Sequence, residues 1–333
     1  MDNLEELTLK VEKLIESEKR EHPENIQFLN SSHAKLIAQI VSNYKLTKSE
    51  ENLPEAQMIF LGAPTGAGKD TLVRKIMTDN PDMNYVILNM DMFRHYHDEI
   101  IQNHENIFDK DFAIKTNQTS YEIYYIIQEL ILREFPGTNI IVTGTMRDLE
   151  WVKEIIARYK NDSKTRYTTS LATLAVPINE SAFSIFERYL GLVNTRGDSN
   201  TPLRYTGLDY HNDTVKKFSS NVLFFEQDLH KNSGNSYFNS IKVYKRNKDI
   251  SDLTEDTLVY DSKTSSQTES ATAHIQEIMH SSAKIDNERL AQILDLIDIN
   301  SDYLKSQELF KSILTDLRNI SPQLNKNLED YSK

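Results

Sequence analysis

The 333-residue chain has no cysteine, so no disulfide can stabilise its fold and it depends on a hydrophobic core. Long apolar runs are also missing, since none approaches the roughly 18 residues that span a bilayer. There is no basic surplus either, because 50 acidic residues outnumber 38 Lys and Arg and leave a net charge of −12. These absences argue against membrane spans and broad nucleic-acid binding. The acidic first residues, MDNLEELTLKVEKL, are unlike a secretion signal, so we expect a cytoplasmic protein with no membrane or nucleic-acid partner.

What the chain does contain fits a globular protein with a sizeable core. Its residues are 38% hydrophobic and 26% charged, and its length allows roughly two domains or one large domain with extensions. We expect an N-terminal helical extension over 1–54, a central domain over 55–262, and a linker with a C-terminal helical tail over 263–333. The net negative charge does not exclude anionic ligands, because a local basic cluster is enough to bind one.

Helical periodicity marks both ends of the chain. Before Pro54, apolar residues recur at three- and four-residue spacing in two segments, and a polar cap at 30–32 precedes the second. After the Ser/Thr-rich linker 263–270, the same spacing returns. The apolar residues are Leu4, Leu7, Val11, Leu14 and Ile15, then Leu36, Ile37, Ile40, Val41 and Tyr44, and finally Ile293, Leu294, Ile297, Leu309, Phe310, Ile313, Leu314 and Leu317. We expect packing helices in both places.

The central domain alternates short apolar runs with helical stretches, beginning at Met58. The runs are MIFLG, YVILNMD, NIIVTGT, SLATLAV and SIKVYKR. Runs of about five apolar residues separated by helices are typical of a buried parallel sheet with crossover helices. The sequence therefore predicts an α/β fold with a mostly parallel sheet flanked by helices.

The first run leads into LGAPTGAGKDT, residues 61–71, in the strand–loop–helix context of a nucleotide-binding phosphate loop. Gly66 and Gly68, with Ala67 between them, let backbone N–H groups turn toward phosphate oxygens. These amides and the N-terminus of the following helix carry partial positive charge, and Lys69 adds a full one. We expect ATP to bind here. The alternative is a glycine-rich turn without a ligand.

Two positions depart from the usual phosphate-loop motif. Ala63 stands at the first glycine position, which tolerates a small residue. Asp70 stands where a Ser or Thr hydroxyl normally reaches Mg²⁺, and a bare carboxylate repels phosphates. Its place in the first helical turn contributes roughly 0.3–1 kcal/mol of stabilisation, and carboxylate oxygens are good ligands for Mg²⁺. We therefore predict a working variant in which Asp70 binds Mg²⁺ and Thr71 shares the task.

The second strand ends in NMDMFRHYH, with Asp91 at its carboxyl edge. The carboxyl ends of the strands form the binding crevice of an open α/β sheet. An Asp at this edge can accept the proton of an attacking hydroxyl during phosphoryl transfer. The alternative is that Asp91 only caps the next helix.

At this point the chain resembles the zeta toxin family, bacterial P-loop kinases of toxin–antitoxin systems. Six motifs carry the resemblance, in the same order, over about residues 57–262. They are LGAPTGAGKDT, NMDMFRHYH, NIIVTGTMRDLEWVKEIIARYK, LAVPINESAFSIFERY, LRYTGLDYHND, and the closing strands IKVYKRNKD and LVYDS. Each motif is weak alone, but the ordered set is specific.

The resemblance implies ATP-dependent phosphorylation of UDP-N-acetylglucosamine on the 3′-hydroxyl of the sugar, which blocks cell-wall synthesis. It implies that Asp91 is the base and Lys69 the phosphate-binding lysine. Arg188 and Arg204 would be lid arginines that neutralise charge on the transferring phosphoryl group. Without the resemblance, either arginine could be an ordinary surface residue.

The acceptor side departs from the family pattern at one position. The resemblance implies substrate contacts for Arg94, Thr143 and Thr145, but Thr143 stands where the family has the Glu of Glu-Gly-Thr. Losing a charge-assisted hydrogen bond removes about 1.5–3 kcal/mol of recognition. Two alternatives therefore stay open: a kinase of another nucleotide or nucleoside metabolite, and a nucleotide-binding regulatory protein without turnover. A second family glutamate has no secure counterpart, Glu129 being the nearest.

The N-terminal extension raises a hypothesis about partners. In the zeta toxin family, a small helical antitoxin packs on the kinase and blocks the ATP site. By resemblance, this chain would bind an antitoxin protein or use 1–54 in cis, since a tethered segment acts at about millimolar effective concentration. Four glutamates there could compete with the phosphates of ATP: Glu16, Glu18, Glu21 and Glu24. The alternative is that these helices only cover an apolar face.

Overall fold

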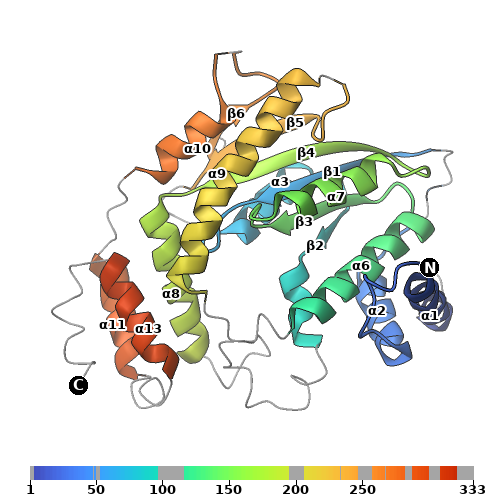
Figure 1. Cartoon of the computed structure of the whole chain (residues 1–333), viewed down its shortest axis with the longest axis horizontal. Helices are drawn as coiled ribbons and strands as arrows, with labels where there is room; N and C mark the ends of the chain where they lie inside the picture. The colour runs from blue at the N-terminus through green and yellow to red at the C-terminus, as the bar shows by residue number, and fades with distance from the viewer. Residues whose placement is uncertain are drawn as a thin grey trace.

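A computed structural model describes residues 4–47, 49, 53–96, 116–194, 206–232, 234–246, 257–266, 268–281, 287–299 and 308–320. Within these ranges a six-stranded sheet of order β2-β3-β1-β4-β5-β6 runs through the molecule (Figure 1). Strands β1 to β5 run parallel, and β6 pairs antiparallel with β5 at one edge. The strands are β1 (Glu55–Gly62), β2 (Tyr85–Leu88), β3 (Asn139–Gly144), β4 (Arg166–Ala175), β5 (Ser240–Lys245) and β6 (Leu258–Asp261). The predicted α/β fold is confirmed.

Helices cover both faces of this sheet (Figure 1). They are α1 (Leu4–Glu21), α2 (Ser31–Asn43), α3 (Lys69–Asp79), α6 (Asn117–Glu134), α7 (Leu149–Lys160), α8 (Ile178–Asn194), α9 (Leu208–Lys231), α10 (Ala271–Met279), α11 (Asn287–Ile299) and α13 (Glu308–Ile320), with the 3-10 helix η1 (Met90–Tyr96). Among the helices of the described ranges, none is long and apolar enough to cross a membrane.

The central strand β1 shows how alternation builds two apolar layers. Met58 and Phe60 are fully buried against the side of the sheet that carries α6, α7, α9 and α10. Leu61, which points to the opposite face, packs with Leu72 of α3. Because successive side chains of a strand point to opposite faces, a continuous apolar run is needed when both faces are covered. This is why β1 reads as MIFLG.

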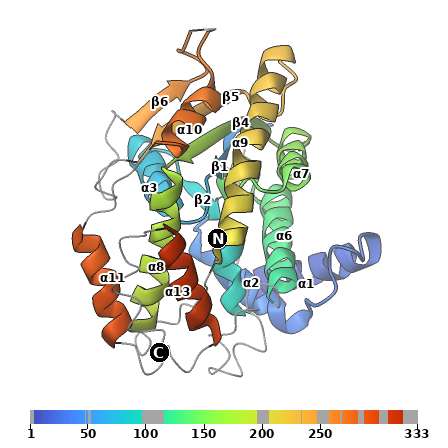
Figure 2. The same ribbon diagram turned by 60° about the vertical axis from the view of Figure 1, so that its left-hand side comes forward.

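The N-terminal helices pack on the body formed by the sheet and its covering helices rather than apart from it. In Figures 1 and 2, α1 and α2 lie alongside α6, and their apolar residues join the same hydrophobic cluster as the sheet. Glu18 of α1 is fully buried, where it accepts hydrogen bonds from the Tyr125 hydroxyl and from Arg133 of α6. Glu122 of α6 in turn accepts the backbone N–H groups of 27–29 at 2.9 Å each. Glu18 is therefore held at α6.

The C-terminal segment divides into two parts. Helix α10, which we had expected to belong to the tail, packs through Ala271 and Ile275 into the main cluster beside α9 and β5. Helices α11 and α13 form the predicted helical tail and pack on α8 in a second apolar cluster (Figure 2). The buried residues of that cluster include the predicted Ile293, Ile297, Ile313, Leu314 and Leu317. The tail therefore begins, in structural terms, after α10.

We predict that Glu122 is needed to hold the N-terminal segment. In the Glu122→Ala variant, three backbone N–H groups lose their acceptor and that of Leu29 is buried, so the free energy of unfolding should fall by about 2–4 kcal/mol. Glu16→Ala, which removes an exposed carboxylate from α1, should change it by less than about 0.5 kcal/mol. Urea denaturation measures both, and equal effects of the two variants would contradict the assignment.

Candidate active site

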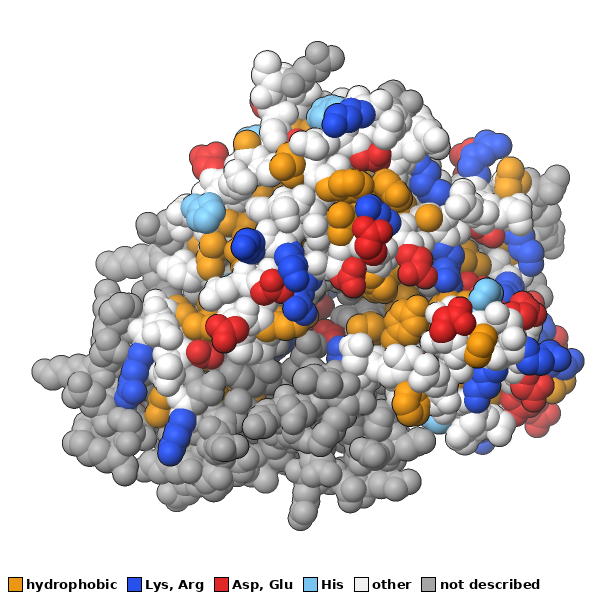
Figure 3. Space-filling view, in the orientation of Figure 1, with side chains coloured by type: hydrophobic (Ala, Val, Ile, Leu, Met, Phe, Trp, Pro, Cys, Tyr) orange, Lys and Arg blue, Asp and Glu red, His pale blue; other side chains and the backbone are white. Residues whose placement is uncertain are grey.

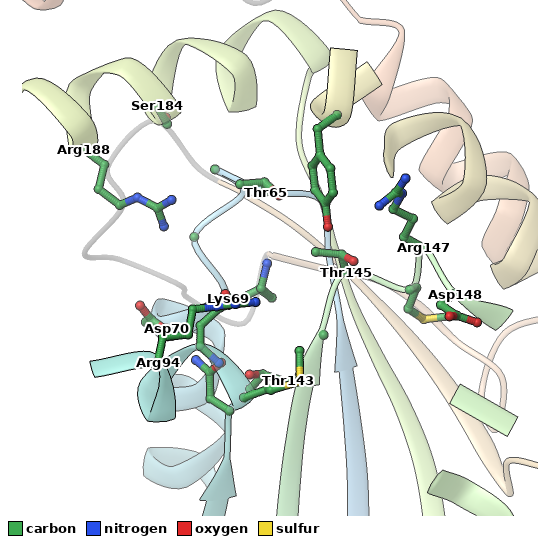
Figure 4. Close-up of a pocket in the computed structure, with 18 of the residues that line it drawn as sticks. Thr65, Lys69, Asp70, Arg94, Thr143, Thr145, Arg147, Asp148, Ser184 and Arg188 are labelled. Atoms are coloured by element: carbon green, nitrogen blue, oxygen red, sulfur yellow. The ribbon is translucent and has the colours of Figure 1, made fainter. Parts of the chain in front are cut away.

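A cavity of about 650 Å³ opens at the carboxyl edge of the parallel strands. Its walls come from the phosphate loop, η1, the N-terminus of α6, the turn after β3, helix α8 and the residue after β5. Figure 4 looks into it, with Lys69, Asp70 and Arg94 grouped on one side and Thr145 and Arg147 on the other. The face drawn in Figure 3 is hollowed near its centre, where charged side chains of both signs and apolar side chains gather. The cavity can therefore take a ligand with charged and apolar parts.

The phosphate loop has the backbone geometry that its glycines predict. Gly66 and Gly68 have φ values of 80° and 93°, in the left-handed region that favours glycine. Gly66, Gly68 and Lys69 line the cavity, whereas Ala67, between the two glycines, is fully buried. The ammonium of Lys69 donates to the carbonyl oxygen of Ala63 at 3.2 Å, so this side chain lies back along the loop. The charge and the turned backbone thus meet where phosphates would lie.

The two candidate magnesium ligands differ in position. Asp70 is exposed in the first turn of α3 and lines the cavity. Thr71 is buried, does not line the cavity, and its hydroxyl oxygen accepts a hydrogen bond from Arg74 at 3.3 Å. The described residues contain no group of three or more acidic or histidine side chains that could bind a metal by themselves. The geometry therefore favours Asp70 over Thr71 as a point of contact with Mg²⁺.

Asp91 lies on η1 and is held by the buried residue Arg94. The Arg94 Nε atom donates to Asp91 Oδ1 at 2.7 Å, and Asn89 accepts the backbone N–H of Asp91 at 3.0 Å. The rest of the Arg94 guanidinium reaches the side chains of Thr116 and Asn117 at the start of α6. Arg94 is 6% exposed and Asp91 56%. The Asp91 carboxylate therefore lies at the cavity wall. Arg94 lines the same cavity and orients this carboxylate through their hydrogen bond.

The end of β3 carries Thr143 and Thr145 into the cavity through a tight turn. Gly62 and Gly144 pair in register at the ends of β1 and β3. A Cβ atom on Gly62 would lie 2.4 Å from the side chain of Met146, so a larger residue there would force that side chain to move. Met146 itself has a positive φ of 54°, and Asn221 of α9 donates to its carbonyl oxygen at 2.6 Å. The turn is thus anchored from the opposite helix.

Thr143 is buried at the cavity wall, with its hydroxyl oxygen lacking a hydrogen-bond partner among the described residues. A buried polar atom without a partner is unfavourable by about 1–3 kcal/mol. A ligand hydroxyl or amide in the cavity would satisfy it. Thr143 therefore offers an uncharged polar contact to a ligand in the cavity.

Helix α8 brings Ser184, Glu187 and Arg188 to the cavity, and Figure 4 shows Arg188 extending from the helix into it. Arg204 lies outside the described residues. The start of α8 is tied to α9 by the fully buried pair Ser181 and His211, whose Oγ and Nε2 atoms lie 2.9 Å apart. Burial lowers the pKa of His211, which favours the neutral ring that such an apolar setting requires.

A family model described as Zeta toxin matches residues 42–265, more than half of the chain. The chain belongs to the zeta toxin family. It therefore has the fold and phosphate-loop site of a P-loop kinase toxin, as the ordered motifs predicted. No curated protein matches it.

Two of the solved structures that match this chain illustrate the shared fold. One, from the PezAT chromosomal toxin–antitoxin system of the human pathogen Streptococcus pneumoniae, is 22% identical with a TM-score of 0.59, covering 82% of this chain and 97% of that one. The other, AvrRxo1-ORF1:AvrRxo1-ORF2 with sulphate ions, is 13% identical with a TM-score of 0.50, covering 79% and 78%. At these identities the two structures show that this chain has the same fold, and they say nothing about its substrate.

Two arginines of this zeta toxin family member escaped the sequence prediction. Arg147, beside Thr145, pairs with Asp213 at 2.6 Å and lies 4.4 Å from the centroid of the Tyr210 ring. Arg246 follows β5, is 3% exposed, and donates through Nη1 to the carbonyl oxygen of Gly66 at 3.3 Å. Residues directly after parallel strands lie at the binding edge, and this rule could have identified Arg246. Arg147 is separated from its strand by a turn that the sequence does not reveal.

The N-terminal helices do not line this cavity, whose described lining residues begin at Thr65. Because Glu18 is buried against α6, it cannot compete with phosphates for Lys69 in this arrangement, which corrects that part of the cis hypothesis. Glu129 does not line the cavity either, since its carboxylate accepts from Arg133 and Arg158. This geometry favours the alternative that α1 and α2 only cover an apolar face of the molecule.

We predict that Gly66 tolerates no side chain. A Cβ atom there would lie 2.1 Å from the backbone carbonyl oxygen of Ser181, in addition to the unfavourable φ. A clash of about 3 kcal/mol in the loop would weaken ATP binding roughly 100-fold. Isothermal titration of Gly66→Ala with ATP measures this. Gly191→Ala is the matched control, because its Cβ would meet no atom of the described residues within 4 Å, and it should keep its affinity. Full ATP affinity in Gly66→Ala would contradict the assignment.

Proposed function

We propose that this zeta toxin family member is an ATP-dependent kinase that phosphorylates the 3′-hydroxyl of UDP-N-acetylglucosamine or a close analogue. One observation carries the proposal: Lys69, Asp91 and Thr143 line the same cavity, though they come from three different segments of the chain. A phosphate-binding group, a candidate base and an acceptor contact are the parts that phosphoryl transfer requires.

The donor side would hold ATP through the loop and its charges. Backbone N–H groups at Gly66 and Gly68 would face the phosphates, with Lys69 supplying a point charge. Arg188 extends into the cavity from the opposite wall, which supports its role as the arginine that neutralises charge on the transferring group. Arg204 is proposed for the same role from the family motif alone. Dependence on ATP also fits a cytoplasmic site of action.

The chemical step would be a direct transfer. The acceptor hydroxyl oxygen attacks the γ-phosphorus of ATP, its proton passes to Asp91, and the bond to the β-phosphate oxygen breaks to release ADP. Arg94 would hold the Asp91 carboxylate toward the hydroxyl through its 2.7 Å ion pair. Orientation of this kind is the main contribution that protein groups make to phosphoryl transfer.

The donor set fits a magnesium ion that arrives with the nucleotide. Asp70 is an exposed carboxylate at the cavity wall, and hard oxygen ligands suit Mg²⁺. When bound, the ion would neutralise charge on the phosphates of ATP. Since Thr71 donates no oxygen to the cavity in this geometry, most other ligands would be phosphate oxygens and water.

The acceptor side supports a nucleotide-bearing substrate. Three aromatic side chains, Tyr121, Trp151 and Tyr210, line the cavity with Thr143 and Thr145. Aromatic rings can stack on a base, and such stacking is worth about 1–3 kcal/mol in nucleic-acid complexes. The uncharged Thr143 favours a second candidate, a kinase of another nucleotide or nucleoside metabolite, because the family contact made by a glutamate is replaced. A nucleotide-binding regulator without turnover is the third candidate, and it is disfavoured by the shared placement of Lys69 and Asp91.

A protein partner is also proposed. One structure of similar fold comes from a chromosomal toxin–antitoxin system, and a partner of that class is the natural candidate here. Because Glu18 is held against α6, it does not reach the cavity. A chain that blocks the cavity would therefore be a separate protein.

The decisive experiment uses ATP, Mg²⁺ and UDP-N-acetylglucosamine, alongside the same mixture with a cell metabolite extract. Mass spectrometry should detect an acceptor that gains one phosphate. Asp91→Asn should slow turnover by roughly 10²–10⁴-fold, as removal of a general base does, while ATP affinity stays within about threefold. Full activity of Asp91→Asn would discard the base. A product from the extract without one from UDP-N-acetylglucosamine would favour the second candidate.

A further prediction concerns Asp70. If its carboxylate binds Mg²⁺, Asp70→Lys should abolish metal-dependent ATP binding, because a cation would stand at the metal position. Asp70→Ser restores the usual hydroxyl and should remain active. Titration of ATP with and without Mg²⁺ tests both variants. Equal affinity of the wild-type protein in the two conditions would rule out the metal contact.

A further inference from the structure

Helix α8 stands between the cavity and the C-terminal helices. Ser184, Glu187 and Arg188 line the cavity, while α11 and α13 contact the same helix (Figure 2). Phe183, Phe186 and Leu190 of α8 are buried with the apolar residues of α11 and α13. Both of these helices lie beyond residue 265, where the family match ends. The segment that carries Arg188 is thus packed against helices that the family model does not include.

Arg289 of α11 adds polar contacts to this packing. Arg289 forms a two-pronged pair with Glu187, its Nε and Nη2 atoms donating to the two carboxylate oxygens at 2.7 Å each. Its Nη2 atom also donates to the hydroxyl of Ser184 at 3.3 Å. The guanidinium lies 5.2 Å from the centroid of the Phe183 ring. Two parallel bonds of this kind fix geometry as well as adding attraction.

The contacts of Arg289 continue to the phosphate loop. Its Nη1 atom lies 3.7 Å from Glu180 Oε1, and the same oxygen lies 3.6 Å from Arg246 Nε. Arg246 Nη1 donates to Ser184 Oγ at 3.2 Å and to the carbonyl oxygen of Gly66. Two arginines and two glutamates therefore connect α11, α8 and the phosphate loop in one charged network.

We propose that Arg289 is a positioning residue, which holds α8 so that Arg188 faces the phosphate loop. Both carboxylate oxygens of Glu187 are occupied by Arg289, so this acidic group beside the cavity is neutralised. Without Arg289, Glu187 would lose its ion-pair partner and place a less compensated negative charge near Arg188 and the phosphates. The inference rests on the proposed kinase function, since Arg188 matters only if phosphoryl transfer occurs.

Steady-state kinetics of the full chain with ATP, Mg²⁺ and UDP-N-acetylglucosamine test the role. Arg289→Gln should lower kcat by roughly 10- to 100-fold, because misplacement of a catalytic group by about 1 Å has effects of this size. The KM for ATP should stay within about threefold, since the loop backbone and Lys69 are unchanged. Arg166→Gln is the matched control: it breaks an exposed arginine–glutamate pair with Glu55 at the amino ends of β4 and β1, opposite the carboxyl ends that line the cavity, and should leave kcat unaltered.

A double-mutant cycle separates positioning from a general structural effect. In an Arg188→Ala background, Arg289→Gln should lower kcat less than about twofold further, because the group that it positions is already absent. Equal losses in both backgrounds would overturn the proposal, and so would an unchanged kcat in Arg289→Gln alone.

Hydrogen exchange supplies a readout that needs no turnover. Arg289→Gln should speed amide exchange over 178–194 while leaving 149–160 of α7 unchanged. If the wild-type protein phosphorylates neither UDP-N-acetylglucosamine nor any metabolite of the extract, the proposed function fails, and this comparison still decides whether Arg289 holds α8. Unchanged exchange over 178–194 would overturn the inference even in an active enzyme.

Discussion

The parallel pairing of β1 to β5 is the constraint on which the candidate active site depends. Because these strands all end at one edge, the segments that follow β1, β2, β3 and β5 meet around a single cavity. Lys69, Asp91 and Arg246 come from the segments after β1, β2 and β5, and Thr143 comes from the end of β3 itself. Reversal of any one strand would carry its residue to the far edge of the sheet. The chemistry is therefore assembled by topology before any side-chain contact is made.

A second feature recurs at three places where a segment is added to this core. Glu122 of α6 binds the backbone of 27–29, Glu226 of α9 accepts from Ser270, Ala271 and Thr272 at the start of α10, and Glu187 of α8 pairs with Arg289 of α11. Carboxylates accept several hydrogen bonds at once, and charge-assisted bonds are roughly twice as strong as neutral ones. In each case apolar side chains form most of the contact, and one glutamate fixes the position of the added segment through its hydrogen bonds.

Much of the site could be predicted from the sequence because its residues sit in local patterns. Gly66, Gly68 and Lys69 belong to one loop whose backbone conformation depends on local residues, and Asp91 lies three residues after an apolar strand. Thr71 shows the limit of this reasoning. Thr71 stands next to Asp70 in the chain, but successive side chains of a helix point about 100° apart. The Asp70 carboxylate therefore lines the cavity, while the Thr71 hydroxyl accepts from Arg74.

By itself, the sequence determined the α/β class, the strands, the phosphate loop, the family and the apolar faces of the terminal helices, since each depends on short-range periodicity or on an ordered set of local motifs. Only the tertiary structure decided which distant residues meet. Glu18 had the appearance of a solvent-exposed competitor for phosphate, yet it is buried with Tyr125, more than a hundred positions away. Arg289 likewise has no local signal, because its partner Glu187 is separated from it by the whole of α9, β5, β6 and α10. Pairing of this kind depends on how helices pack, and packing is a property of the complete set of apolar faces rather than of any one of them.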